Sequence, residues 1–132
     1  MTRPPVGGES RVRVLLVEDS DVYRESLAYL RGRVDGIDVV GAVATGSAAA
    51  SACEELRADV AVIDYRLPDV NGAVAAGDVR ERCPGVAVVF LSASAGDDET
   101  AAARALGAPL VRKDAGLDTL VEALRDATAG GP

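Results

Sequence analysis

The sequence predicts an α/β protein with a five-stranded parallel sheet covered by helices on both faces. Short runs of Val, Ile and Leu alternate along the chain with longer segments whose apolar residues recur at helical spacing. The alternation of strand and helix favours right-handed crossovers, and therefore parallel pairing of the strands. Nearly continuous apolar strands are typical of a sheet that is buried on both faces.

Five runs have the composition of strands, which is rich in β-branched residues and bounded by turn formers. They lie at residues 12–17, 37–43, 59–64, 86–92 and 109–112. The first, third and fourth are almost wholly apolar, which predicts central positions in the sheet. The last is short and begins with Pro109, which suits an edge strand.

Helical segments are predicted between and after these strands. They cover residues around 23–34, 46–58, 72–82, 97–107 and from 117 towards the AGGP ending. In the first, four residues share one helix face: Tyr23, Leu27, Leu30 and Val34. Pro84-Gly85 ends the third helix, while early acids and Gly107 give the fourth the polarity that a helix dipole favours.

The length of 132 residues fits one domain with a sizeable core. We expect a flexible tail over residues 1–10, one domain over 11–129, and a tail or the start of a linker over 130–132. Within these 132 residues we expect neither a linker to a second domain nor an output domain.

Composition excludes several classes of function. A net charge of −7 argues against direct binding to nucleic acid or to an anionic membrane, because both need a basic face. The sequence has no apolar run of the roughly 20 residues that a spanning helix needs, and its start does not resemble a secretory signal. Two cysteines without metal-binding spacing and no histidine argue against zinc and indicate reduced thiols in the cytoplasm.

Residues capable of chemistry follow four of the predicted strands where each strand ends. Glu18 and Asp19 follow the first strand, Asp64 ends the third, Ser92 ends the fourth, and Lys113 follows the fifth. Lys113 is also the only lysine in a chain whose other cationic side chains are all arginine. Because the carboxyl ends of parallel strands meet at one edge of the sheet, we expect these side chains to converge.

Each of these residues alone has an ordinary structural explanation. One of residues 19–21 could cap the first helix, and Asp64 could cap a turn. Ser92 could bond the local backbone, and Lys113 could be a surface charge. Their joint occurrence after successive strands favours a common site.

Three neighbouring carboxylates repel one another and require a hard divalent cation, for which Mg²⁺ is the natural candidate. A metal-bound carboxylate that faces a hydroxyl and an ammonium is suited to accept a phosphoryl group as a nucleophile. The pattern therefore indicates phosphoryl transfer to a carboxylate.

Four stretches together resemble the receiver domain of bacterial two-component response regulators. They are the acid pair ED, VIDYRLPDVNG around Asp64, FLSAS, and GAPLVRKDAG, and the resemblance covers residues 12–128. VRVLLVEDS and the KDA after the lysine are most similar to the NarL/LuxR-type branch, whose members usually carry a helix-turn-helix output domain. The resemblance implies a flavodoxin-like (CheY-like) fold with strand order 2-1-3-4-5.

The resemblance also implies roles for the acids. Asp64 would be the phosphoacceptor, with a histidine on a separate sensor kinase as donor. Asp19 and Asp64 would bind Mg²⁺ together with the backbone carbonyl of Arg66, and Glu18 would act mainly through water.

The remaining roles concern the response to phosphorylation. Ser92 occupies the position of the switch hydroxyl, and Lys113 that of the lysine that contacts a phosphoryl oxygen. Arg66 and Ser94 fall at positions that tune the lifetime of the phosphoryl group. The sequence departs from the family at Leu110, where a switch aromatic is usual, and the segment before the lysine is one residue short.

The resemblance implies that the chain is not an enzyme beyond its own phosphorylation and slow dephosphorylation. Expected partners are a sensor histidine kinase and a downstream output domain or protein, with the chain a monomer or a phosphorylation-dependent dimer. A pseudo-receiver that is never phosphorylated is the alternative. A dinucleotide-binding enzyme lacks support because the first strand is followed by acids, and a phosphatase would need an acid where Arg66 stands.

Overall fold

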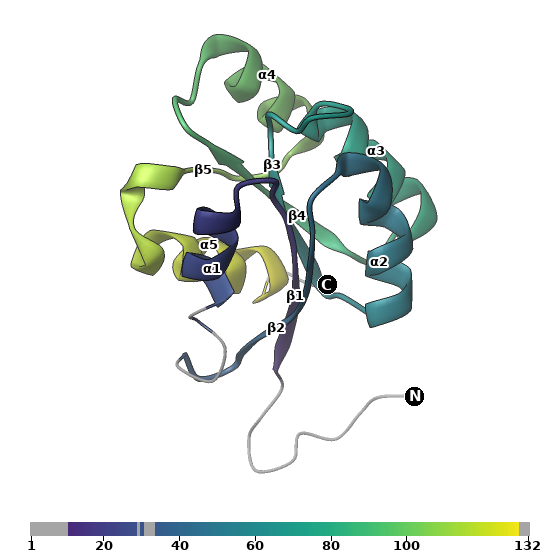
Figure 1. Cartoon of the computed structure of the whole chain (residues 1–132), viewed down its shortest axis with the longest axis vertical. Helices are drawn as coiled ribbons and strands as arrows, with labels where there is room; N and C mark the ends of the chain where they lie inside the picture. The colour runs from purple at the N-terminus through teal and green to yellow at the C-terminus, as the bar shows by residue number, and fades with distance from the viewer. Residues whose placement is uncertain (1–10, 29, 31–33, 130–132) are drawn as a thin grey trace.

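The computed structural model, which describes residues 11–28, 30 and 34–129, has a parallel sheet between two layers of helices (Figure 1). The strands are β1 (Val12–Val17), β2 (Ile37–Val43), β3 (Val60–Asp64), β4 (Ala87–Ser92) and β5 (Leu110–Arg112). All neighbouring strands pair in parallel, in the order β2-β1-β3-β4-β5. The predicted fold class and strand order are confirmed, while the tails expected at 1–10 and 130–132 lie outside the described residues.

Five α-helices and two short 3₁₀ turns connect and follow the strands. They are α1 (Asp21–Ala28), η1 (Gly46–Ala48), α2 (Ala49–Leu56), α3 (Gly72–Arg82), α4 (Asp97–Leu106), η2 (Lys113–Ala115) and α5 (Leu117–Ala129). Helices α1 and α5 cover one face of the sheet, and α2, α3 and α4 cover the other (Figure 1).

The core has two layers because alternate residues of each strand point to opposite faces. In β1, Val14 and Leu16 pack in the layer under α1 and α5, and Leu15 and Val17 pack in the layer under the other three helices. Valine and leucine dominate the first layer, whereas alanine is the commonest residue of the second, which also holds Phe90 of β4, the one phenylalanine of the chain.

Some predicted boundaries differ from the structure. The prediction that the first helix continues to Val34 is wrong, because α1 ends at Ala28, although Leu30 and Val34 still contact the same core. Strand β3 begins at Val60, one residue later than predicted, although Asp59 is still bonded to β1: its side chain accepts a hydrogen bond from the backbone N–H of Arg13, at 2.8 Å. The predicted Pro109 start of β5 moves to Leu110 because proline has no N–H for the ladder.

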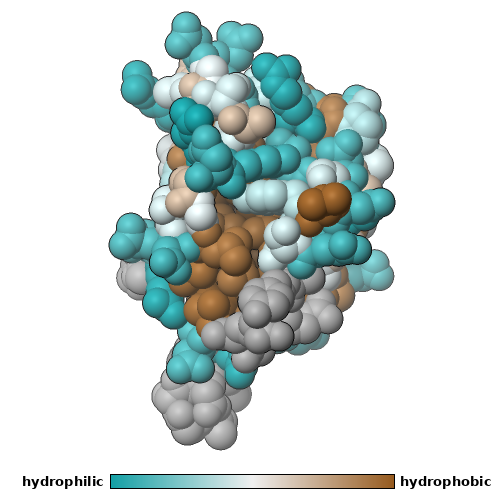
Figure 2. All heavy atoms as spheres, turned by 60° about the vertical axis from the view of Figure 1, so that its left-hand side comes forward, coloured by the Kyte–Doolittle hydropathy of each residue, from teal (hydrophilic) through white to brown (hydrophobic). Residues whose placement is uncertain are grey.

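The surface on the side of α1 and α5 is mostly polar and carries a large apolar area, with smaller apolar spots elsewhere (Figure 2). A shallow hollow between these two helices is lined by Val22, Glu25, Ser26 and Leu117. Among the described residues, no helix has the length and apolar character needed to cross a membrane.

Candidate functional site

Three acids meet where β1 and β3 end. Val17 of β1 pairs with Ile63 of β3, so the residues that follow, Glu18 and Asp64, emerge side by side at the carboxyl edge of the sheet. Together with Asp19 they form a cluster in which one oxygen from each carboxylate lies within 4.8 Å of the others. Glu18 and Asp64 are buried and Asp19 is exposed. The predicted convergence of the three acids is thus present in the structure.

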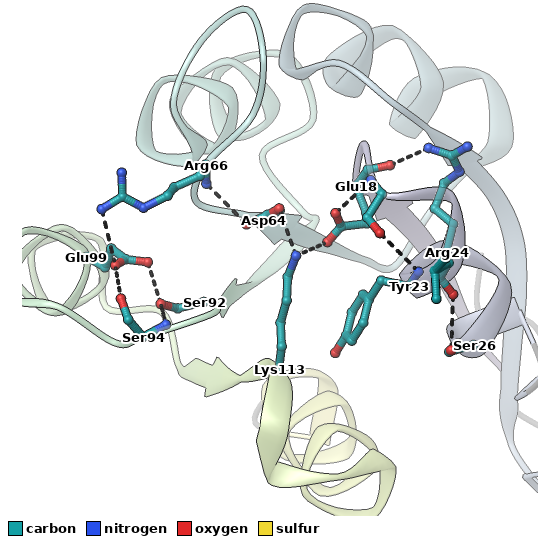
Figure 3. A network of polar contacts seen from close by, with 12 residues as sticks. Glu18, Tyr23, Arg24, Ser26, Asp64, Arg66, Ser92, Ser94, Glu99 and Lys113 are labelled. Carbon is teal, nitrogen blue, oxygen red and sulfur yellow. Dashed lines mark hydrogen bonds and ion pairs between the residues drawn. The ribbon is translucent and has the colours of Figure 1, made fainter.

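Lys113 reaches into this cluster from the residue after β5 (Figure 3). Its ammonium nitrogen lies 2.7 Å from Glu18 Oε1 and 3.0 Å from Asp64 Oδ2. The same nitrogen lies 4.9 Å from the centre of the Tyr23 ring, a cation–π distance. The Lys113 side chain is only 22% exposed, so the surface-charge explanation of this residue is wrong.

The protonation states of Glu18 and Lys113 depend on their burial and on the contact between the two side chains. Burial raises the pKa of Glu18, and the hydrogen bonds from Lys113 and from the Ser20 amide only partly oppose this effect. Burial by itself would lower the pKa of Lys113, but its hydrogen bonds to Glu18 and Asp64 outweigh that cost and raise the pKa above its usual value. Lys113 therefore remains an ammonium at neutral pH.

The loops around the acids are held by local hydrogen bonds. The backbone N–H of Arg66 donates to Asp64 Oδ1 at 3.1 Å, which fixes the carboxylate relative to the loop after β3. Ser20 caps α1 by accepting from the Tyr23 N–H at 3.3 Å. Of residues 19–21, Ser20 therefore performs the capping, and the Asp19 carboxylate is left beside the acid cluster.

Ser92 lies at the end of β4, as predicted, but its hydroxyl is not bonded to the acid cluster. The hydroxyl donates to the buried carboxylate of Glu99 on α4, and its oxygen accepts from the N–H groups of Ser94 and Ala95. The local-backbone explanation of Ser92 therefore describes part of its environment. Glu18, Asp19, Asp64 and Lys113 are brought together, and Ser92 faces a separate carboxylate (Figure 3).

Sequence reasoning missed the functional contacts of three residues. Tyr23 was assigned only to a helix face, and Arg24, which donates to the backbone oxygen of Glu18 at 2.7 Å, was not singled out. Glu99 was assigned only to the acidic first turn of the fourth helix, yet it is 2% exposed. Glu99 lies three residues after Gly96, a position where a glutamate commonly caps a helix, and this spacing is the one feature of the sequence that indicates a contact with the loop before α4.

Leu110 stands at the start of β5, where the family usually has a switch aromatic. It is partly buried and packs against the core layer that contains Phe90 and Leu106. The Leu110 side chain therefore packs between β5 and the layer of α2, α3 and α4.

The donor set fits a hard divalent cation. Three carboxylates offer oxygen ligands, which are the ligands that Mg²⁺ prefers. Glu18 Oε1 is buried and lies 2.7 Å from the Lys113 ammonium, which leaves the second oxygen of this carboxylate and the exposed Asp19 to face the cluster. The acid cluster can therefore hold a metal through Asp19, Asp64 and Glu18.

Comparison with known proteins agrees with this geometry. The family model of the response regulator receiver domain matches residues 14–125. The response regulator GacA of Pseudomonas viridiflava is 31% identical over 120 residues, which are 90% of this chain and 56% of GacA. The DNA-binding transcriptional activator DevR/DosR of Mycobacterium tuberculosis is 36% identical over 120 residues, which are 90% of this chain and 55% of that protein. The chain thus spans about half the length of these relatives.

Solved structures show the same likeness. The receiver domain of the putative response regulator NarL from M. tuberculosis has a TM-score of 0.83 and 30% identity, covering 92% of this chain and 98% of that one. The response regulator domain of Thermotoga maritima CheB has a TM-score of 0.82 and 27% identity, covering 92% and 99%. With its parallel sheet, its acid cluster and a match over residues 14–125, the chain belongs to the response regulator receiver domain family.

Proposed function

We propose that this receiver accepts a phosphoryl group on Asp64 from a phosphohistidine of a sensor kinase. The observation that carries the proposal is the Lys113 ammonium 3.0 Å from Asp64 Oδ2, within a cluster of three acids at the sheet edge, of which Glu18 and Asp64 are buried. A cation fixed beside a buried carboxylate can also stabilise the negative charge of a phosphoryl group that binds to this carboxylate. The chain itself contains no histidine, so the donor histidine comes from outside these 132 residues.

The step is a displacement at phosphorus. A carboxylate oxygen of Asp64 attacks the phosphorus, the bond between phosphorus and the imidazole nitrogen breaks, and its electron pair stays on that nitrogen. The product is an acyl phosphate on Asp64. Lys113 is placed to exchange its contact with Asp64 for one with a phosphoryl oxygen, which stabilises the added negative charge.

The residues that would hold Mg²⁺ are Asp19, Asp64 and the backbone carbonyl of Arg66, with Glu18 acting through water. When bound, the cation would neutralise charge that develops on the phosphoryl oxygens. Glu18 also anchors Lys113 at 2.7 Å, so this acid orients the ammonium as well as supporting the metal.

Phosphorylation adds a charge of about −1.5 to −2 at the sheet edge, and such a charge biases an equilibrium between two surface conformations. We infer that this bias controls an output outside these residues, either a DNA-binding domain or a protein partner, in the cytoplasm. The similarity to the DNA-binding transcriptional activator DevR/DosR supports a transcriptional output. In this scheme the chain catalyses at most its own phosphorylation and slow dephosphorylation.

The test is the intact mass of the protein after incubation with acetyl phosphate and Mg²⁺. We expect one phosphoryl adduct in the wild type, none without Mg²⁺, and none in Asp64→Asn, which keeps the size of the side chain. Asp98→Asn removes an exposed acid at the start of α4 and should retain the adduct. A folded wild-type protein that forms no adduct would contradict the proposal and favour a pseudo-receiver.

A further inference from the structure

Glu99 is a buried acid that the acid cluster does not include. It lies in the first turn of α4 with 2% of its surface exposed, whereas its neighbours Asp97 and Asp98 are exposed. Burying a carboxylate is costly unless hydrogen bonds compensate for the lost water. The contacts of Glu99 are therefore informative about what this residue does.

Both oxygens of Glu99 have partners on the loop after β4 (Figure 3). Oε2 accepts from the Ser92 hydroxyl, and Oε1 accepts from the Ser94 hydroxyl and the Gly96 N–H, each at 3.2 Å. Burial would raise the pKa of Glu99, but hydrogen bonds led by that of Ser92 outweigh it and hold the pKa below its usual value. Glu99 is thus a buried carboxylate held by three donors, of which the Ser92 hydroxyl is the one that bonds Oε2.

The Ser92 hydroxyl is fully engaged by this arrangement. A hydroxyl has one proton, which goes to Glu99, and its oxygen accepts from the N–H of Ala95 at 2.6 Å and of Ser94 at 3.2 Å. In this state Ser92 cannot donate to a phosphoryl oxygen on Asp64. To do so it must first leave Glu99.

Arg66 connects the same carboxylate to the phosphoacceptor. Its backbone N–H donates to Asp64 Oδ1, and its guanidinium lies 3.9 Å from Glu99 Oε1. The Arg66 side chain is 74% exposed, so this ion pair is weak and easily exchanged. A phosphoryl group on Asp64 would offer the guanidinium an alternative anion.

We propose that Glu99 is a positioning residue that holds Ser92, and more weakly Arg66, in the unphosphorylated arrangement by competing with the phosphoryl group for the same donors. This inference rests on the proposed phosphorylation of Asp64. The arrangement with Ser92 free is the one that binds the phosphoryl group best, so any interaction that depletes it lowers the apparent affinity. Weakening the contact between Glu99 and Ser92 should therefore raise the apparent affinity for the phosphoryl group.

The test is the affinity for beryllofluoride, a phosphoryl mimic, measured in Mg²⁺ buffer from amide NMR shifts. Glu99→Gln keeps the size of the side chain and removes its charge. Because a hydrogen bond to a charged group is stronger than one to a neutral group, we expect roughly tenfold tighter binding. Asp98→Asn removes a neighbouring exposed charge from the same helix turn, and it should bind like the wild type.

Measuring the same substitution in a Ser92→Ala variant distinguishes a positioning role of Glu99, which requires the Ser92 hydroxyl, from a purely structural role, which does not. Because Glu99 holds Ser92 more strongly than Arg66, Glu99→Gln should change the affinity much less when the Ser92 hydroxyl is absent. If the substitution tightens binding there as much as in the wild type, or if Glu99→Gln binds like Asp98→Asn, the inference is overturned.

A measurement on the wild type covers the case in which Glu99→Gln does not fold. Saturation with beryllofluoride should shift the Glu99 carboxyl carbon resonance at constant pH, because the carboxylate loses its hydrogen bond from the Ser92 hydroxyl. An unmoved resonance with beryllofluoride bound contradicts the inference. A wild type that binds no beryllofluoride and forms no phosphoryl adduct contradicts the proposed function itself, so the two failures are distinguishable.

Discussion

One ammonium, that of Lys113, faces two buried carboxylates at the end of the sheet. Glu18 Oε1 and Asp64 Oδ2 lie 2.7 and 3.0 Å from it, and the Tyr23 ring lies against its other side. A compact ammonium fits between packed walls and can move from one oxygen to another, whereas a planar guanidinium needs more room and favours bidentate partners. This difference explains why an arginine-rich chain has a lysine at this position.

Lys113→Arg should leave the fold and Mg²⁺ binding largely intact but weaken the conformational response to beryllofluoride. The reason is that the guanidinium cannot occupy the same space between Glu18 and Asp64. The response is measured from the amide shifts of the loop after β4. Arg112→Lys, the reverse exchange at the exposed neighbouring position, is the control and should respond like the wild type. An undiminished response in Lys113→Arg would refute this role of the lysine.

At the level of elements, the start of α3 is packed against the end of β3. The Gly72 N–H donates to the Tyr65 oxygen at 2.6 Å, which folds the loop after the phosphoacceptor back onto its own strand. A Cβ built on Gly72 would lie 2.7 Å from the Tyr65 Cα and 2.8 Å from the backbone carbonyl oxygen of Asp64. Both distances are too short, because these backbone atoms cannot move aside. The position of Asp64 therefore depends on a glycine eight residues further along the chain.

Gly72→Ala should lower the free energy of unfolding by roughly 1–3 kcal/mol, the usual cost of overpacking, and should slow phosphorylation because the strand end moves. Urea denaturation and the rate of adduct formation with acetyl phosphate measure the two effects. The control is Gly77→Ala in the same helix, where a Cβ meets nothing within 4 Å. That control should be neutral or stabilised by about 0.5–1 kcal/mol, because alanine is the better helix former. Equal behaviour of the two variants would contradict the packing argument.

At the scale of the whole molecule, Asp69 ties two distant segments together. Its carboxylate, in the loop before α3, accepts from the N–H groups of Gly46 and Ser47 at 2.8 and 2.9 Å. Hydrogen bonds from the Ser47 side chain and from both amides hold the pKa of Asp69 well below its usual value. A carboxyl with a lowered pKa stabilises the fold above its unfolded-state pKa of about 3.9, and this stabilisation is lost as the pH falls through the folded-state value.

Asp69→Asn should therefore be less stable than the wild type at neutral pH, and the difference should shrink as the pH falls below about 4. Urea midpoints at neutral and acid pH measure this change. Asp78→Asn, an exposed acid in the middle of α3, is the control for loss of charge alone. A difference for Asp69→Asn that stays constant from neutral to acid pH would count against the linkage.

The sheet and four site residues could be predicted from the sequence because their pattern is local. Nearly continuous apolar runs define β1, β3 and β4, and residues that end or follow parallel strands must meet at one edge, which brings together Glu18, Asp19, Asp64 and Lys113. The direction of the Ser92 hydroxyl could not be predicted, because it depends on the packing of α4 that buries Glu99. The early end of α1 at Ala28 was missed because its apolar spacing continues through Leu30 and Val34 into the core.

The most direct test of the account is chemical localisation of the phosphoryl group. Acyl phosphates are reduced by borohydride, which converts a phosphorylated aspartate into homoserine. After incubation with acetyl phosphate and Mg²⁺, reduction and tandem mass spectrometry should find homoserine at position 64. Homoserine at another acid of the cluster, or an unmodified Asp64 in protein that carries a phosphoryl adduct, would contradict the central claim.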